Sequence, residues 1–372
     1  MSTTNGPVPF LDLGRQYREI DEEVKAAIEG VMSMTNFIGG PSVAEFERAF
    51  ADFIGADFCI GVANGTDALE IALEALDFSE PGEVIVPAAS FIATSEAVSR
   101  SGHDIVFADV DEATYVLDPN DVRKRITSRT RAIIPVHLFG HPAPMPELLE
   151  LAKAKGLMLI EDCAQAHGAE IEGSRVGTFG VAATFSFYPG KNLGAYGDAG
   201  ALTTGDEYLA KRVRMIANHG RISKYQHEFE GRNSRLDAIQ AAVLSVKLRH
   251  LEKWTERRRS LAEQYREGLQ GVGDLILPVE RDLYRHVYHL FVIRSGSRDE
   301  LQAALAEGGI ATGVHYPRAL PQLAAYSEHP QHQETFFANS MADEVLSLPM
   351  GDSIDSGQAG RVIDTVRKFF SS

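Results

Sequence analysis

The sequence lacks the features that place a protein in an oxidising compartment or in a membrane. It has only two cysteines, Cys59 and Cys163, which are far apart and form no Cys-x-x-Cys pattern, so neither a disulfide framework nor a cysteine-based metal site is expected. No apolar run approaches the roughly 18 residues that cross a bilayer, and residues 1–17 lack the basic and apolar regions of a signal peptide. We therefore expect a cytoplasmic protein without a membrane partner.

Positive charge is also scarce. The chain has 36 lysines and arginines against 52 aspartates and glutamates, a net charge of −16, and such a chain would repel nucleic acid. It has no Gly-x-x-x-x-Gly-Lys-Ser/Thr motif, no Gly-x-Gly-x-x-Gly after a strand and no His-Glu-x-x-His, which disfavours the nucleotide and zinc sites that those motifs build. His167 could be a metal ligand, but its neighbours lack ligand spacing, so we expect no metal.

What the chain does have is an alternation of short apolar runs and amphipathic segments. This alternation predicts βαβ units and a mostly parallel sheet. The predicted strands are 58–63, 83–88, 105–110, 132–139 and 157–162, and the predicted helices are 21–31, 42–53, 66–76, 92–101, one after Pro119, and 145–155.

The second half of the chain continues with mixed elements. The patterns there predict a helix at 207–216, a polar loop at 218–237, a long helix at 236–269, strands at 289–294 and 311–316, and a helix at 298–308. A chain of 372 residues is long enough for one large and one small domain. We therefore predict an α/β fold with a large domain of residues 1–250 and a smaller C-terminal α/β domain of residues 251–372.

Polar residues just after the apolar runs are the candidates for a site, because active sites of parallel sheets lie at the carboxyl ends of the strands. After the first run, Asn64-Gly65-Thr66 opens a helix whose free N–H groups and positive dipole end suit a phosphate. An ordinary N-cap formed by Asn64 or Thr66 is the alternative. Phe91, after the run at 83–88, could stack on a flat ring or belong to the core.

Two further residues suggest a specific chemistry. Asp162 ends a buried run and needs a cationic or hydrogen-bonding partner; a pyridinium nitrogen would be one, and a turn cap or a structural arginine are the alternatives. Lys191 lies among glycines, prolines and aromatics, where desolvation lowers the pKa of an amine and a neutral amine can form a Schiff base. A loop lysine near a turn is the alternative. Ser186 could reach the same phosphate as Thr66.

These are the parts that a pyridoxal 5′-phosphate (PLP) site needs, and they lie in longer sequence stretches that match those of a known family. The stretches include FIGGPSVAEFE, GVANGTDAL, VIVPAASFIAT, IEDCAQAHGA, FSFYPGKNLGAYGDAGAL and GRNSRLDAIQAAVL. In these motifs the chain resembles, nearly from end to end, the sugar aminotransferases grouped as DegT/DnrJ/EryC1/StrS, which have the aspartate-aminotransferase (type I PLP) fold. Cys163 departs from the pattern, since many relatives have alanine there.

The resemblance implies roles around the cofactor ring. Lys191 would bind PLP covalently and move a proton during catalysis. Asp162 would hold the pyridinium nitrogen, Gln165 would contact the O3′ side of the ring, and Phe91 would stack on its face.

The resemblance also implies the phosphate and substrate contacts. Gly65, Thr66 and Ser186 would bind the phosphate, and Asn233 of the partner subunit would close this site in a homodimer with shared active sites. The residues implied near the substrate are Tyr188, His219, His315 and Tyr316.

The implied reaction moves the amino group of L-glutamate to a nucleotide-linked keto sugar, giving an amino sugar for glycan or natural-product biosynthesis. The segment from Tyr225 through GRNSRLDAIQAAVLSVKL resembles relatives that aminate C3 of the hexose more than those that aminate C4. A non-catalytic regulatory protein and a sugar dehydratase are the alternatives, but the dehydratases have histidine where this chain has Lys191. The nucleotide stays open, and the candidates for contacting its diphosphate are Lys224, Arg232, Arg235 and Arg318.

Overall fold

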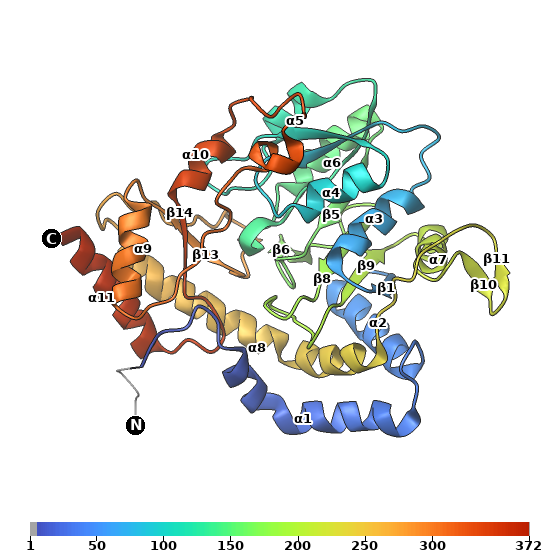
Figure 1. The fold of residues 1–372 in the computed structure, drawn as a ribbon, viewed down its shortest axis with the longest axis horizontal. Coiled ribbons are helices and arrows are strands. Elements are labelled where there is room, and N and C mark those ends of the chain that lie inside the picture. Colours follow the sequence, from blue (N-terminus) through green and yellow to red (C-terminus); the bar gives the residue numbers. More distant parts are fainter. Residues whose placement is uncertain (1–5, 372) are drawn as a thin grey trace.

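The computed structural model describes residues 6–371, and a seven-stranded sheet lies at the centre of this part of the chain (Figure 1). The strand order is β1-β9-β8-β5-β4-β2-β3; β9 is antiparallel to both of its neighbours, and the other pairings are parallel. The predicted α/β architecture with a mostly parallel central sheet is confirmed. The strands are β1 (Phe58–Val62), β2 (Glu83–Pro87), β3 (Asp104–Ala108), β4 (Thr130–Ile133), β5 (Met158–Asp162), β8 (Ala182–Ser186) and β9 (Gly200–Thr204).

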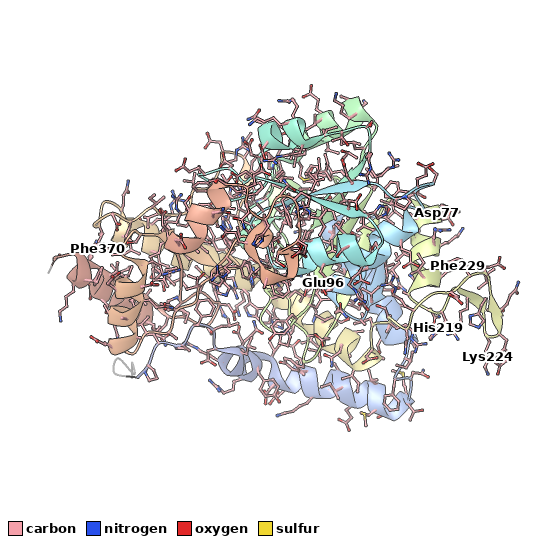
Figure 2. All side chains as sticks on the ribbon, turned by 45° about the horizontal axis from the view of Figure 1, so that its top comes forward. Asp77, Glu96, His219, Lys224, Phe229 and Phe370 are labelled. Carbon is pink, nitrogen blue, oxygen red and sulfur yellow. The ribbon has the colours of Figure 1, made fainter. Side chains whose placement is uncertain are left out.

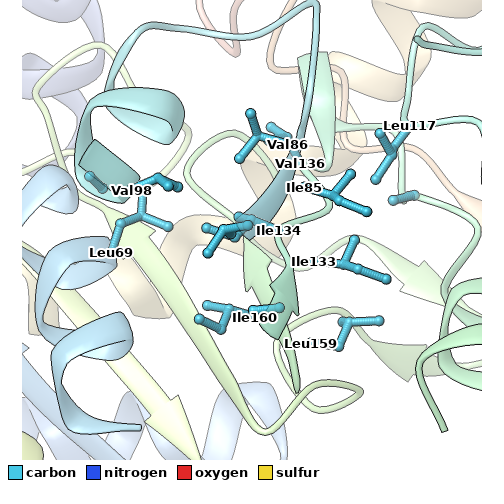
Figure 3. Packing of buried hydrophobic residues seen from close by; sticks show 14 of the residues in the cluster. Leu69, Ile85, Val86, Val98, Leu117, Ile133, Ile134, Val136, Leu159 and Ile160 are labelled. Atoms are coloured by element: carbon cyan, nitrogen blue, oxygen red, sulfur yellow. The ribbon is translucent and has the colours of Figure 1, made fainter. Parts of the chain in front are cut away.

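The central strands are apolar on both faces, as expected for a parallel sheet covered by helices. Ile85, Ile133 and Leu159 are buried and lie next to one another across the sheet (Figure 3). Burying each side chain of this size stabilises the fold by about 1.5–3 kcal/mol. The helices that connect and cover these strands are α3 (Gly65–Ala75), α4 (Ala93–Arg100), α5 (Pro119–Arg125), α6 (Met145–Lys155) and α7 (Glu207–Ile216).

Three helices form a layer along one side of the sheet. The 32-residue α8 (Ala238–Leu269) packs against α1 (Leu13–Met34) and α2 (Pro41–Ile54), and in Figure 1 α1 and α8 run along the lower side of the molecule. The predicted helix at 21–31 is too short: α1 already begins at Leu13, because the side chain of Asp12 accepts a hydrogen bond from the N–H of Arg15 (2.8 Å).

The C-terminal part of the chain has its own small hydrophobic core. Its strands β13 (Phe291–Arg294) and β14 (Val345–Leu348) are antiparallel, and its helices are α9 (Arg298–Glu307), α10 (Phe337–Glu344) and α11 (Ser356–Ser371). The proposed domain boundary between residues 250 and 251 falls inside α8. In addition, Val8 forms a β-bridge with Ile310, so the N-terminal segment also contacts the C-terminal part.

Several local predictions differ from the structure. Residues 311–316 are not a strand and have only a bridge from Gly313 to Ser347, and the predicted strand at 132–139 ends at Ile133, because Pro135 removes a backbone donor. The polar loop at 218–237 contains a short hairpin, β10 (Arg221–Ser223) and β11 (Gln226–His227), that projects from the right of Figure 1.

The remaining short elements are β6 (Glu170–Ile171), β7 (Ser174–Arg175) and β12 (Tyr284–Arg285), which form a small sheet, and the 3₁₀ turns η1 (Leu138–Gly140), η2 (Leu320–Gln322) and η3 (Ala324–Tyr326). None of the helices within residues 6–371 is both long and apolar enough to cross a membrane. Residues 1–5 of the segment in which a signal peptide was considered lie outside the described residues.

Candidate active site

The candidate residues from three parts of the sequence meet at one edge of the sheet. β1, β5 and β8 run in the same direction, so their carboxyl ends lie together. Asp162 is the last residue of β5, Ser186 is the last of β8, and Gly65 begins α3 directly after β1. A Cβ atom on Gly65 would come within 2.6 Å of the Cβ of Ser186, so glycine is required for this close approach.

The N-terminus of α3 lies beside Ser186 and has the free N–H groups that an anion site needs. The side chain of Asn64 caps the helix by accepting a hydrogen bond from the N–H of Asp67 (2.8 Å), as the N-cap reading expects. The preceding N–H groups, those of Gly65 and Thr66, have no acceptor within the helix because they lie in its first turn. The cap and the anion site are therefore compatible, and the Ser186 hydroxyl is next to the free N–H groups.

Asp162 is buried and is held by hydrogen bonds at both carboxylate oxygens. Its Oδ2 accepts a hydrogen bond from the Thr94 hydroxyl (2.9 Å), and its Oδ1 accepts one from the N–H of Ala164 (3.1 Å). Burial raises the pKa of Asp162, and the two hydrogen bonds and nearby Lys191 oppose that rise. Such a carboxylate gains from a cationic partner, as a protonated ring nitrogen would provide.

Lys191 lies in the loop between β8 and β9, and two distant residues fix that loop. The amide of Asn192 donates a hydrogen bond to the carbonyl of Val287 (3.1 Å), and the buried Lys247 of α8 donates one to the carbonyl of Gly194 (2.6 Å). The backbone that follows Lys191 is therefore anchored to the C-terminal part and to α8.

The amine of Lys191 is electrostatically unusual. Burial lowers its pKa to about 8, and the charge of Asp162 partly opposes this shift. Within residues 6–371, no carboxylate forms an ion pair with the Lys191 amine at 4.0 Å or less. An amine with this pKa is neutral in an appreciable fraction of molecules near neutral pH, which is the form that attacks a carbonyl and accepts a proton.

An aromatic and amide cluster lies beside these groups. The side chain of Gln165 accepts a hydrogen bond from the N–H of Phe139 (2.6 Å) and donates one to the hydroxyl of Tyr316 (3.1 Å). The rings of Tyr316 and Phe91 are 6.0 Å apart, and Phe91 is 55% exposed. Phe91 is therefore not a core residue, and its ring is free to stack on a flat ligand. Burial raises the pKa of Tyr316 to about 12, so its hydroxyl keeps its proton.

Two of the expected substrate residues border the same edge. The ring of His315 packs edge-on against Tyr316 (5.6 Å between centroids), and its Nδ1 lies 2.9 Å from the hydroxyl of Ser347. Tyr188 is 60% exposed and its N–H donates to the Ser186 hydroxyl (3.3 Å). The backbone of Tyr188 thus contacts a candidate phosphate residue, and the His315 ring contacts Tyr316, which is hydrogen-bonded to Gln165.

Two predicted residues are not brought to this edge within the chain. His219 is exposed and lies by the hairpin, on the same side of the molecule as Lys224 and away from the sheet (Figure 2). Asn233 is also exposed. The hydrogen bonds of the described residues include none from either side chain to Lys191 or Asp162.

The candidates for contacting a diphosphate differ in availability. Arg232 is paired with Glu70 (2.5 Å) and with Glu74, so its charge is already compensated within the chain. Arg318 and Lys224 form no ion pair among residues 6–371, and Arg235 donates to the amide oxygen of Asn218 (3.2 Å). Arg232 is thus the weakest of the four candidates for contacting a diphosphate.

His137, Glu161 and Cys163 form a buried cluster with the spacing of a metal site. Hydrogen bonds already occupy both ring nitrogens of His137 and both carboxylate oxygens of Glu161. The N–H of Ala143 donates to Nδ1 of His137 (2.8 Å), so Nε2 carries the proton and donates it to Glu161 (3.1 Å). Glu161 also accepts bonds from the N–H groups of Gly177, Phe179 and Gly180. The hydrogen bonds of this cluster therefore stabilise the turn before β8.

Three residues that support the site have little signal in the sequence. Thr94, Asn192 and Lys247 act through contacts with residues far away in the sequence, and neither their type nor their spacing indicates such a role. For Lys247 the sequence has one indication, which is that this lysine lies within the apolar repeat of α8; the structure shows that it is buried.

Comparisons with known proteins identify the family of this chain. A model of the DegT/DnrJ/EryC1/StrS aminotransferase family matches residues 18–367. The chain is 47% identical over 363 residues to the dTDP-3-amino-3,4,6-trideoxy-alpha-D-glucose transaminase of Streptomyces venezuelae, and the match covers 97% of this chain and 96% of that protein.

Solved structures are similar over almost the whole chain. DesV of S. venezuelae, in complex with a ketimine intermediate, has a TM-score of 0.97 and 45% identity, with 99% of this chain and 100% of that chain covered. NtdA from Bacillus subtilis, with bound cofactor PMP, has a TM-score of 0.92 and 30% identity, with 99% and 86% covered. This chain belongs to the DegT/DnrJ/EryC1/StrS aminotransferase family.

Proposed function

We propose that this enzyme uses PLP to transfer the amino group of L-glutamate to the C3 keto group of a nucleotide-linked deoxyhexose. The observation that carries the proposal is the amine of Lys191, whose lowered pKa and nearness to the buried Asp162 suit a covalent cofactor with a cationic ring nitrogen. The name of the S. venezuelae relative, a transaminase of a dTDP-linked 3-amino sugar, supports position C3 and a dTDP-linked substrate.

The residues at the sheet edge fit the cofactor in shape and charge. Gly65, Thr66 and Ser186 would bind its phosphate, where a side chain on Gly65 would leave no room. Gln165 has one amide hydrogen beyond its bond to Tyr316 and would direct it at the O3′ side of the ring. When bound, PLP supplies an electron sink for cleaving a Cα–H bond.

The chain's own groups would perform the proton transfers. Lys191 would hold the cofactor covalently, be displaced by the amino donor, and then move a proton between the substrate carbon and the cofactor carbon. Asp162 would keep the ring nitrogen protonated, and Phe91 would cover one ring face. Glutamate and the sugar would react in turn at the same place.

The substrate would enter from the exposed side of the edge. Tyr188, His315 and Tyr316 are the proposed sugar contacts. Tyr316 lies next to Phe91 and Gln165, His315 packs against Tyr316, and the backbone of Tyr188 contacts Ser186. Among the basic groups, Arg318 follows Tyr316 closely in sequence and has a free charge, so it is the favoured diphosphate contact within the chain. We further propose a cytoplasmic enzyme with domains 1–250 and 251–372.

A substrate panel tests the reaction and the position of amination. With L-glutamate as donor, kcat/KM for a dTDP-linked 3-keto-6-deoxyhexose is expected to exceed that for the 4-keto isomer by at least about tenfold. Formation of 2-oxoglutarate and mass spectrometry of the sugar measure both products. A preference for the 4-keto sugar would move the reaction to C4, and no transfer to any member of the panel would favour a non-catalytic regulatory protein.

We propose that the enzyme is a homodimer with shared active sites. His219 is exposed at the base of the projecting hairpin (Figure 2), and the exposed Asn233 forms a β-bridge with Asn218, next to His219. This position suits residues that reach into the site of the partner subunit. The hairpin also exposes Ile222 (59%) and Tyr225 (84%), and apolar groups of this size are commonly covered in an assembly.

Mixing two inactive variants tests this arrangement. If each site combines Lys191 of one subunit with Asn233 of the partner subunit, a mixed dimer of Lys191→Met and Asn233→Asp chains contains one intact site. Random mixing should then restore about one quarter of the wild-type activity. Activity no higher than the mean of the two separate variants would contradict shared sites, and ultracentrifugation shows whether dimers form.

A further inference from the structure

A chain of hydroxyl groups leads to the buried carboxylate of Asp162. Thr94 lies in the first turn of α4 and is 1% exposed, and its hydroxyl is 2.9 Å from Oδ2 of Asp162. The hydroxyl of Ser90, in the segment between β2 and α4, lies 2.9 Å from that of Thr94. Ser90 is 4% exposed, so solvent does not provide alternative partners for these groups.

The direction of each hydrogen bond follows from counting protons. An ionised carboxylate can only accept, so Thr94 must donate its single hydroxyl proton to Asp162. The Thr94 oxygen is then free only to accept, so the Ser90 hydroxyl must donate to Thr94. The chain therefore runs from Ser90 through Thr94 to Asp162, and each bond polarises the next.

We propose that Thr94 is a positioning residue that keeps Asp162 ionised and turned toward the ring nitrogen of the cofactor, with Ser90 fixing the direction of the Thr94 hydroxyl. This inference rests on the proposed function, since it needs PLP at the sheet edge. It adds two residues whose sequence context, Ala-Ser-Phe-Ile-Ala-Thr, suggests only a helix start.

The need for such a residue arises from the surroundings of Asp162. Burial disfavours its ionised form, and the titratable groups that face it are Lys191 after β8, His137 after β4 and Tyr316 of the C-terminal part. His137 accepts a hydrogen bond from Ala143 at Nδ1 and donates one to Glu161 from Nε2, and Tyr316 carries no charge while its proton is bound. In the loaded enzyme the Lys191 nitrogen is joined to the cofactor, so Thr94 and the N–H of Ala164 become the main local support of the carboxylate.

Threonine offers a matched pair of substitutions. Thr94→Val keeps the shape but removes the hydroxyl, and Thr94→Ser keeps the hydroxyl. A hydrogen bond to a charged group is worth roughly one order of magnitude in an equilibrium constant or more. We therefore expect Thr94→Val to weaken PLP binding by about tenfold, measured by titration of the apoenzyme, and Thr94→Ser to stay within about twofold of the wild type.

A second readout distinguishes positioning from a structural role. A protonated ring nitrogen repels the proton on the cofactor-linked Lys191 nitrogen. If Asp162 holds the ring proton less well, this repulsion weakens, so the Lys191 nitrogen keeps its proton to higher pH. The pH midpoint of the visible absorbance of the loaded enzyme should rise by about half a unit or more in Thr94→Val and remain unchanged in Thr94→Ser.

The control is Thr203→Val, which removes an equally buried hydroxyl whose bond goes to the carbonyl of Gly177 in the structural part of the sheet. It should lower the melting temperature without moving the pH midpoint. If Thr94→Val does not fold, Ser90→Ala decides: an upward shift of the midpoint supports the chain of bonds, and an unchanged midpoint overturns it.

The failure of this inference is distinct from the failure of the proposed function. A wild type that binds PLP at Lys191, together with a Thr94→Val variant that matches it in PLP affinity and pH midpoint, overturns only the role of Thr94. A wild type without lysine-linked PLP, shown by borohydride reduction and peptide mapping, overturns the proposed function itself.

Discussion

Replacing Lys191 with methionine is expected to lower kcat for amino transfer by at least about ten-thousandfold. The variant loses the covalent attachment and the base that moves the proton, and proton transfer alone is worth about 10²–10⁴-fold. Methionine keeps most of the volume and lacks the amine, so the loop between β8 and β9, anchored by Asn192 and Lys247, should stay in place. Single-turnover assays with glutamate measure the loss in the first half of the reaction.

The same substitution should make the apoenzyme more stable at neutral pH. Burial lowers the pKa of Lys191 to about 8 from its ordinary 10.5, so between these values the unfolded chain binds more protons than the folded one. The stability of the wild type therefore rises with pH in this window. Below pH 8 the buried charge is a full cost that methionine removes, and above pH 10.5 the advantage of Lys191→Met should vanish.

Denaturant unfolding of the two apoenzymes at several pH values measures this difference. Lys155→Met, at an exposed position in the last turn of α6, controls for the loss of a lysine as such and should show no comparable pH-dependent gain. A Lys191→Met variant that retains more than about one hundredth of the wild-type kcat would contradict the role of the amine. A Lys191→Met variant that is inactive but no more stable than the wild-type apoenzyme would contradict only the burial of the Lys191 amine.

The site could be predicted where a short motif and a topological rule coincide. Asp162 follows a buried run, and Gly65 follows another, so the rule that sites lie at the carboxyl ends of parallel strands is enough to bring them together. Ser186 and Lys191 are joined to them first by chemistry, as a hydroxyl able to reach the same phosphate and an amine able to form a Schiff base, and then by the resemblance. The strands β8 and β9 that carry this loop were not predicted, because runs such as Gly200–Thr204 are short and rich in small residues.

The supporting contacts could not be predicted, because they depend on tertiary distances. Thr94 and Asp162 are 68 residues apart, and Lys247 reaches Gly194 across 53 residues; neither spacing has a periodic signature. Arg232 shows the opposite error: its type suited a diphosphate, but two glutamates of α3 already neutralise it. The basic groups of a site can be ranked only after the internal ion pairs are known.

Replacing Asp162 with asparagine is the second substitution for which a large effect is expected. Asparagine cannot carry a negative charge, so a protonated ring nitrogen loses its counter-ion in a buried place. Because removing one such preorganised electrostatic contact costs about 10²–10³-fold in rate, kcat should fall by roughly a thousandfold. PLP binding should weaken as well.

The melting temperature on adding PLP gives an independent measurement of the same effect. Burial raises the pKa of Asp162, so in the apoenzyme the folded state binds more protons than the unfolded chain at pH values between the two pKa values, and stability falls as the pH rises through the folded pKa. At neutral pH the ionised carboxylate is thus a cost that a cationic ligand relieves, and PLP should stabilise the wild type more than Asp162→Asn.

Asp121→Asn is a suitable control for this comparison. Asp121 is also buried, and it pairs with Arg125 in α5, far along the chain from the sheet-edge residues. The Asp121→Asn substitution should lower the stability of the protein by the same amount with and without PLP, and it should leave kcat near that of the wild type. An Asp162→Asn enzyme with wild-type kcat and the full PLP-induced rise in melting temperature would show that the ring nitrogen does not use this carboxylate. The chain of hydroxyl groups from Ser90 through Thr94 would then serve only the packing of α4 against β5.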